Sequence, residues 1–280
     1  MLEKSRVAFV GAGVMAEAII KGLVGRQWID PARIVAADVR PERGIELRER
    51  YAVAFTSDNR EAVAGADVVV LSVKPQILPQ VLPSLSGGVP KEALVLSIIA
   101  GARIAVLSKG LSHAAIVRCM PNTPAQIGQG ITGWTASASV TGAQRDQARE
   151  LLAALGTEVY VEEESSLDAV TALSGSGPAY VFLFMEALVE AGVQMGFPHS
   201  LARQLVFQTV KGSAEYAIGS PLDLPQLRKQ VTSPGGTTEA AMLSYDKDGF
   251  RNVVARAVQA AFNRSVELGK ADPSNPPARS

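Results

Sequence analysis

The sequence predicts an α/β fold, with a Rossmann-like, doubly wound, mostly parallel sheet followed by an all-α dimerisation domain. Two observations support this prediction. Short β-branched runs alternate with helical patterns through the first half of the 280 residues, and from residue 167 onward only helical patterns remain. Strands that alternate with helices form βαβ units, whose parallel strands are covered on both faces. We therefore predict a dinucleotide-binding domain at residues 1–163 and a substrate-binding and dimerisation domain at residues 164–270.

Each predicted strand of the first domain is a short apolar run that ends in a turn or a helix. The runs are residues 6–10, 33–37, 53–55, 68–73, 94–98 and 116–120. The fourth run is continuously apolar from Val68 to Leu71, as expected for a central strand covered on both faces. An amphipathic helix near residues 143–155 precedes a further short strand near 158–161, which we expect to close one edge of the sheet.

The second half is predicted to contain five helices, at residues 178–195, 199–217, 224–231, 237–244 and 249–268. Residues 180–185 are apolar around the whole circumference of the first of these helices, so every side of it must be covered. A partner subunit can do this, and we expect an obligate homodimer, with larger assemblies of dimers left open. Residues 271–280 contain three prolines and are predicted to be a disordered tail.

The composition excludes several classes of function. Twenty-seven basic residues balance 27 acidic ones, which removes the electrostatic reason to expect nucleic acid or an anionic membrane as a partner. The longest apolar stretch without charge has a serine- and glycine-rich centre at residues 174–178, so we expect no membrane span. One cysteine and two distant histidines leave no pattern for a metal site. A reducing, cytoplasmic location is expected.

A glycine pattern lies between the first predicted strand and the helix after it. Gly11 and Gly13 permit a tight turn there, and the amides of the helix start can receive a pyrophosphate. The position on the first strand of a βαβ unit favours a dinucleotide site over an ordinary turn. Asp38 ends the second strand, where an acidic residue holds the adenosine ribose of NAD. Arg40 and Arg43 follow, and they are either grips for a 2′-phosphate or only the solvated start of a helix.

Two further strand ends carry proline-containing turns at the edge where doubly wound folds bind their ligands. Lys74 and Pro75 follow the fourth strand, and we interpret Lys74 as a loop residue with backbone contacts to the cofactor, a catalytic acid being the alternative. Met120 ends the sixth strand and is followed by the turn that contains Asn122, in a position to face a nicotinamide. A rigid turn without a ligand is the alternative there.

The helical half carries two segments rich in glycine and hydroxyl groups, at residues 174–178 and 231–239. Each precedes a predicted helix and so offers free amides and hydroxyls to an anion. The second segment is the better candidate. It has four hydroxyl side chains around a diglycine, which is more than helix capping requires, although capping is the commoner use of such residues.

Taken in order, these motifs resemble those of the pyrroline-5-carboxylate reductase family over nearly the whole chain. The motifs are GAGVM at 11–15, VKP at 73–75, RCMPNTP at 118–124, LSGSGPAY at 173–180 and TSPGGTT at 232–238. Val14 stands where the family often has asparagine, and Ile98 and Ile99 replace a smaller pair before Ala100. The resemblance implies hydride transfer from NAD(P)H to the C=N carbon of 1-pyrroline-5-carboxylate, which gives L-proline, the last step of proline synthesis. It also implies that the helices of one subunit complete the cleft of the other.

The resemblance also suggests roles for individual residues. The Thr238 hydroxyl is the catalytic candidate and is expected to hydrogen-bond the ring nitrogen. The amides of Gly236 and Thr237 and the Ser233 hydroxyl are expected to hold the substrate carboxylate. The remaining substrate-binding candidates are Gly235 and Ser176. The cofactor-binding candidates are Gly11, Gly13, Val14, Met15, Asp38, Arg40, Asn59, Ser72, Val73, Lys74, Pro75, Ala100, Met120 and Asn122. Because the family often prefers NADPH and two guanidiniums should outweigh one carboxylate, we expect NADPH to be preferred and NADH to be usable.

Two other functions are weighed against this one. The β-hydroxyacid dehydrogenases share the architecture but place a lysine in the helix at residues 178–195, which here contains neither lysine nor histidine. A protonated imine already attracts hydride and needs no strong general acid, whereas a ketone does. A nicotinamide-binding redox sensor or scaffold needs Gly11 and Gly13 but has no use for the hydroxyl-rich segment that contains Ser233 and Thr238.

Overall fold

The computed structural model describes residues 2–270, and these form two compact units. The first unit comprises the chain up to Ser176 together with the residues from Ala261 on, and the second comprises Gly177–Ala260. The predicted boundary at residue 163 therefore differs from the division by contacts, because both ends of the predicted helical domain pack with the first unit. The predicted disordered tail at 271–280 lies outside the described residues.

The first unit contains a sheet of eight strands in the order β3-β2-β1-β4-β5-β6-β7-β8. The strands are β1 (Val7–Val10), β2 (Ile34–Ala37), β3 (Ala54–Thr56), β4 (Val68–Leu71), β5 (Leu94–Ser97), β6 (Ile116–Met120), β7 (Gly130–Ala136) and β8 (Gly156–Tyr160). Neighbouring strands are parallel except for β6 and β7. Strand β4 lies between β1 and β5 and is fully buried, so the predicted fold class and central strand are confirmed.

Strand β7 is a strand that the sequence pattern did not predict. It contains Gly130 and Gly133, which weaken a strand signal because glycine adds no side chain to the sheet surface. The structure explains Gly133, since a Cβ atom there would lie 2.7 Å from the Cγ1 atom of Val170. The close approach of a neighbouring helix thus excludes the β-branched residues by which strands are recognised. Strand β8 pairs only with β7 and closes the edge of the sheet, as predicted.

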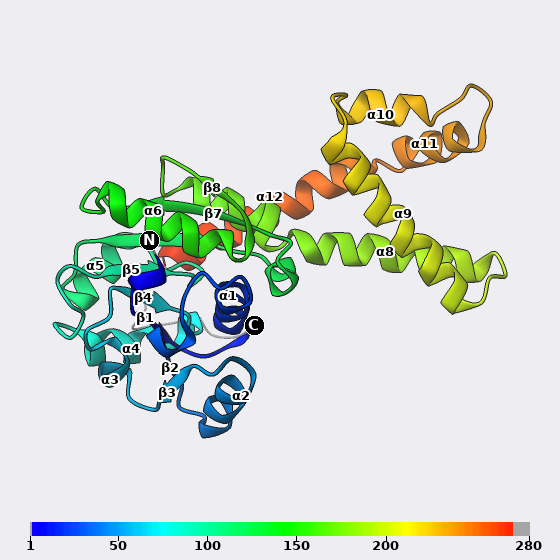
Figure 1. The fold of residues 1–280 in the computed structure, drawn as a ribbon. Coiled ribbons are helices and arrows are strands. Elements are labelled where there is room, and N and C mark those ends of the chain that lie inside the picture. The colour runs from blue at the N-terminus through cyan, green and yellow to red at the C-terminus, as the bar shows by residue number, and fades with distance from the viewer. Residues whose placement is uncertain (1, 271–280) are drawn as a thin grey trace. The chain divides into compact units, whose positions relative to one another are not determined.

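Helices cover both faces of the sheet, as Figure 1 shows. They are α1 (Val14–Gly25), α2 (Pro41–Tyr51), α3 (Asn59–Val63), α4 (Leu78–Leu85), α5 (Ile104–Leu111) and α6 (Gly142–Ala153). Successive residues of β1 enter opposite cores. Phe9 packs in the cluster that contains residues of α1 and α6, and Val10 packs in the cluster that contains residues of α4 and α5. This alternation follows from the two-residue side-chain period of a strand.

The segment at residues 174–178 is not the loop before a helix that the sequence suggested. Helix α7 (Ser166–Val170) continues through a π-helical turn (Thr171–Gly175) into α8 (Gly177–Gln194). The Ser176 amide donates to the Thr171 carbonyl at 2.8 Å, so this amide is not offered to an anion. Glycine at 175 has a packing reason, because a Cβ atom there would lie 2.8 Å from the Cε atom of Met120.

The second unit is built from α8, α9 (His199–Gly219), α10 (Leu224–Gln230), α11 (Thr237–Lys247) and the first part of α12 (Phe250–Lys270). The last turns of α12 belong to the first unit, where buried polar contacts hold them. The Asp168 carboxylate is 2% exposed and accepts from Ser265 Oγ at 2.8 Å and from Arg103 Nη2 at 3.2 Å. Arg103 Nε also donates to the Gly269 carbonyl at 3.1 Å. These bonds fix the end of α12.

Helix α8 carries a row of large apolar side chains that residues 2–270 leave exposed. Val181, Phe182, Leu183 and Phe184 are 40–66% exposed. The helical stretch Ser166–Gln194 has 29 residues and a window of mean hydropathy 1.3 that is only 11% buried, so by length and composition alone it meets the criteria for a membrane span. The sequence led us to expect no span, and the exposed apolar surface requires a cover of some kind.

Candidate active site

The glycine loop after β1 is shaped to receive a dinucleotide diphosphate. Gly11 has a φ of +96°, and a Cβ atom there would lie 2.9 Å from the carbonyl group of Ser72 and from Val73 Cγ1. Gly13 is the N-cap of α1 without a side-chain cap, and a Cβ atom there would meet nothing within 4 Å. The amides of the first helical turn have no partner within a helix. An open cradle lined by such amides at a positive helix end fits a diphosphate.

The loop lies at the point where the strand order reverses, between the carboxyl ends of β1 and β4. Ser72 follows β4, and its hydroxyl donates to the Gly11 carbonyl at 2.6 Å, so this side chain shapes the loop. Val73 contacts Gly11, and Lys74 and Pro75 begin an exposed 3₁₀ turn at the same edge. Val14 and Met15 form the first turn of α1, where Val14 is exposed.

Asp38, at the end of β2, is held by the loop and by Arg40. Its Oδ2 atom accepts from the Ala12 amide at 3.0 Å, and the Arg40 guanidinium donates to both carboxylate oxygens at 2.9 and 3.1 Å. Burial pushes the pKa of the Asp38 carboxyl upward, but the hydrogen bonds from the Arg40 side chain and from the two backbone amides of Ala12 and Arg40 outweigh it and hold the pKa below its usual value. Asp38 is therefore ionised at neutral pH, and half-exposed Arg40 neutralises it.

Arg43 is not free to grip a 2′-phosphate, contrary to one of the two interpretations of the sequence. Its Nε atom donates to the Ala12 carbonyl at 3.0 Å, its Nη2 atom to Glu17 at 2.7 Å and its Nη1 atom to Glu46. The side chain is only 14% exposed. The alternative of a solvated helix start is also wrong for this residue, because all three nitrogens have protein partners.

The other cofactor candidates follow successive strands along the same edge. Asn59 begins α3 after β3, and Ala100 lies in the turn after β5. Met120 ends β6 and packs against the π-helical turn. The Asn122 side chain is already engaged, since it donates to Ser174 Oγ at 3.3 Å and accepts from the Ile131 amide at 3.0 Å. Asn122 therefore braces the turn after β6.

In the second unit, the substrate-binding candidates form the loop between α10 and α11. Helix α11 begins at Thr237, and its N-cap Gly236 has no side-chain cap. The backbone amides of two of these candidates are already occupied. The Gly236 amide donates to the Ser233 carbonyl at 3.0 Å, and the Gly235 amide donates to the Glu239 carboxylate at 2.7 Å. The amides available to an anion are therefore those of the first helical turn, which begins at Thr237.

The hydroxyl groups of this loop are divided between two uses. The Thr232 hydroxyl donates to the Arg228 carbonyl of α10 at 2.7 Å. Of the four hydroxyl residues in this segment, Thr232 is therefore used by the fold. The hydroxyls of Thr237 and Thr238 lie in the first turn of α11, and that of Ser233 lies in the loop just before it. Sequence reasoning missed Glu239, which holds this loop through the Gly235 amide, although a glutamate three residues after an N-cap is a known capping signal. Ser176, the remaining substrate candidate, belongs to the first unit and ends the π-helical turn.

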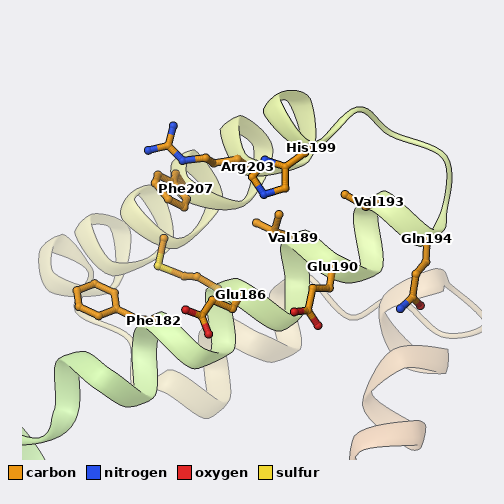
Figure 2. A pocket seen from close by; sticks show the side chains of 10 residues that line it. Phe182, Glu186, Val189, Glu190, Val193, Gln194, His199, Arg203 and Phe207 are labelled. Atoms are coloured by element: carbon orange, nitrogen blue, oxygen red, sulfur yellow. The ribbon is translucent and has the colours of Figure 1, made fainter.

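Two apolar grooves lie within the second unit, away from this loop. One, of about 620 Å³, separates α8 from α9, and Figure 2 shows Phe182, Glu186 and Val189 on α8 beside His199, Arg203 and Phe207 on α9. The other, of about 390 Å³, is lined by Leu183, Phe184, Tyr245, Phe250 and further residues of α8 and α12. Both extend the exposed apolar surface of α8.

Comparison with known proteins identifies the family. A family model described as pyrroline-5-carboxylate reductase dimerisation matches residues 164–268, and one described as NADP oxidoreductase, coenzyme F420-dependent, matches residues 6–101. A pyrroline-5-carboxylate reductase of Pseudomonas aeruginosa is 45% identical over 95% of this chain and 97% of its own length. The chain belongs to the pyrroline-5-carboxylate reductase family.

Solved structures of pyrroline-5-carboxylate reductases agree with this assignment. The Coxiella burnetii protein is 39% identical, with a TM-score of 0.89 over 95% of this chain and 99% of that one. The Plasmodium falciparum protein, solved with NADP bound, is 31% identical, with a TM-score of 0.87 over 96% and 100%. The region matched by the dimerisation model includes the exposed face of α8.

Proposed function

We propose that this protein reduces 1-pyrroline-5-carboxylate to L-proline with a reduced nicotinamide dinucleotide. The observation that carries the proposal is the 45% identity to a pyrroline-5-carboxylate reductase over 95% of the chain. The proposal is further supported by an open glycine loop in one unit and a hydroxyl-rich helix start in the other. The two subunits of a homodimer, formed through the α8 surface, are expected to complete each other's clefts, and assemblies of such dimers remain a prediction. The cytoplasmic location also remains a prediction.

The reaction adds a hydride to the C=N carbon and a proton to the ring nitrogen. A bound reduced nicotinamide supplies the hydride. The Thr238 hydroxyl hydrogen-bonds the ring nitrogen. This bond orients the ring and stabilises the nitrogen in the transition state, as its charge changes. The Ser233 hydroxyl and the first-turn amides of α11, beginning with Thr237, bind the carboxylate at the positive end of the helix. Because the protonated imine is itself electrophilic, the site requires no buried acid.

Steady-state oxidation of NADPH and NADH with 1-pyrroline-5-carboxylate tests the proposed function. We expect turnover with both cofactors and formation of L-proline. Binding of NADP⁺ without turnover would favour a redox sensor or scaffold. Turnover of a β-hydroxyacid in place of the imine would favour the dehydrogenases of related architecture.

Ser233→Ala is expected to raise the KM for 1-pyrroline-5-carboxylate about tenfold while kcat changes little. The hydroxyl contacts the carboxylate equally in the ground state and the transition state. Its loss therefore weakens the binding of substrate and of transition state to the same degree. A hydrogen bond to a charged group accounts for an effect of this size. Ser244→Ala, the same change at an exposed position of α11, is the matched control. A fall in kcat at unchanged KM would contradict the assignment.

For the cofactor, we propose that NADPH is preferred and that NADH is usable. Arg43 is bound to Glu17 and Glu46, so Arg40 is the arginine left to bind the 2′-phosphate. Arg40 is the N-cap residue of α2, and its side chain is half exposed. Arg40 now pairs with Asp38, and this pairing neutralises the carboxylate that would otherwise repel the phosphate. One arginine with a neutralised neighbour favours NADPH less strongly than two free arginines would.

Arg40→Ala is therefore expected to lower kcat/KM for NADPH about tenfold and to leave that for NADH nearly unchanged. The change removes the guanidinium and also frees the Asp38 carboxylate, and both effects act against a 2′-phosphate. Specificity constants for the two cofactors in wild type and variant provide the measurement. If NADH is the better cofactor of the wild type, or if both constants fall together, Asp38 holds the ribose and Arg40 has no selective role.

A further inference from the structure

Ala12, in the centre of the glycine loop, is held at both of its peptide groups by side chains from the segment after β2. Ala12 is fully buried. Its N–H donates to Asp38 Oδ2 at 3.0 Å, and its carbonyl accepts from Arg43 Nε at 3.0 Å. The contact with Asp38 belongs to the expected ribose site. The contact with Arg43 has no role in the proposed reaction.

The geometry of a trans peptide gives this second contact a consequence. The carbonyl of one residue and the N–H of the next belong to one planar unit and point in opposite directions. The Gly11–Ala12 unit is anchored at both ends, because Ser72 Oγ donates to the Gly11 carbonyl and the Ala12 N–H donates to Asp38. In the following unit, Arg43 holds the Ala12 carbonyl, so the Gly13 N–H is turned to the opposite side. Gly13 itself borders open space.

Arg43 is in turn held by two carboxylates. Nη2 donates to Glu17 of α1 at 2.7 Å, and Nη1 donates to Glu46 of α2. Glu17 also accepts from Arg50 at 2.9 Å and from the Tyr51 hydroxyl at 3.0 Å. Burial pushes the pKa of Glu17 upward, but the hydrogen bonds from Arg43, Tyr51 and Arg50 outweigh it and lower the pKa, so the carboxylate is ionised at neutral pH. With two acidic partners, Arg43 adds no net positive charge to the loop.

We propose that Arg43 is a positioning residue for the dinucleotide diphosphate. It fixes the Ala12–Gly13 peptide so that the Gly13 amide faces the diphosphate, and Glu17 holds Arg43 in the orientation that does this. Without this contact the peptide can rotate, and rotation would turn the Ala12 carbonyl oxygen toward the phosphate oxygens, which it repels. The inference rests on the proposed function, since it concerns the cofactor of that reaction. It differs from a direct grip on a 2′-phosphate, which would need free guanidinium nitrogens.

Isothermal titration of the purified full-length protein with two probes tests this inference. NADP⁺ contains the diphosphate, and 2′-AMP contains only the adenosine and the 2′-phosphate. Arg43→Gln and Glu17→Gln are each expected to raise the Kd for NADP⁺ about tenfold and to leave the Kd for 2′-AMP unchanged. Arg43→Lys should behave like Arg43→Gln, because one ammonium cannot replace three nitrogens in a planar fork.

Arg50→Gln is the matched control, because Arg50 also binds Glu17 but does not touch the loop. It should leave both Kd values unchanged. Thermal melting of each variant without ligand shows whether it is folded, and Glu17→Gln keeps the test valid if the Arg43 variants melt early.

Three results would overturn the inference while leaving the proposed function intact. Unchanged NADP⁺ affinity in Arg43→Gln and Glu17→Gln would show that the loop needs no such support. Restored affinity in Arg43→Lys would indicate simple attraction by charge, and a parallel loss of 2′-AMP binding would indicate direct contact with the 2′-phosphate. A wild-type protein that bound neither NADP⁺ nor NAD⁺ would instead overturn the proposed function.

Discussion

Phe184→Asp is expected to turn the protein into an inactive monomer. Phe184 is 40% exposed on α8, and its ring lies 6.4 Å from that of Phe250, which itself contacts Tyr245 at 5.0 Å. These rings line one of the apolar grooves in the region matched by the dimerisation model. Burying a large apolar side chain contributes about 1.5–3 kcal/mol, and burying an unpaired carboxylate costs more. A two-fold interface contains each residue twice, so the effect is doubled.

Light scattering coupled to size exclusion, together with turnover, measures both consequences. Ile45→Asp is the matched control, since Ile45 is equally apolar and 58% exposed but lies on α2 of the first unit. It should remain a dimer and stay active. If wild type proves to be a stable, active monomer, the site must be complete within one chain and this prediction is wrong.

Thr238→Ala is expected to lower kcat about 10- to 100-fold while the fold and the Kd for NADP⁺ stay nearly unchanged. The hydroxyl is proposed to bond the ring nitrogen, and a donor or acceptor at a reacting atom can contribute several kcal/mol to the transition state. Loss of a hydroxyl at a helix start costs only about 1 kcal/mol of stability. A catalytic role of Thr238 therefore predicts a fall in kcat, whereas a capping role predicts only a small shift in melting temperature.

Two further variants at this position separate the hydroxyl from its surroundings. Thr238→Ser keeps the hydroxyl and should recover most of the turnover, whereas Thr238→Val keeps the shape and should remain as impaired as Thr238→Ala. Unchanged kcat in the alanine variant would move Thr238 to a structural role at the start of α11.

The sequence was sufficient for the parts of this protein that depend on local pattern. The continuous apolar run at Val68 predicted the central strand, and the glycine pattern after the first strand predicted the loop at the switch point of the sheet. The order of five motifs predicted the family. The all-round apolar stretch that includes Phe184 predicted a surface that the described part of the chain leaves exposed. The family rests on a resemblance of motifs, and the others follow from residue type and spacing, which are properties of the chain before it folds.

The tertiary structure alone decided which polar groups remain available. Arg43 was, with Arg40, a candidate to bind the 2′-phosphate, yet its bonds go to Ala12 and Glu17, 31 and 26 residues away. The Gly236 amide, expected to bind a carboxylate, turns back to Ser233. Strand β7 exists because β6 and β8 pair with it, although its glycines obscure the pattern. A sequence shows which donors and acceptors a residue carries, but through-space neighbours determine which of them are already paired.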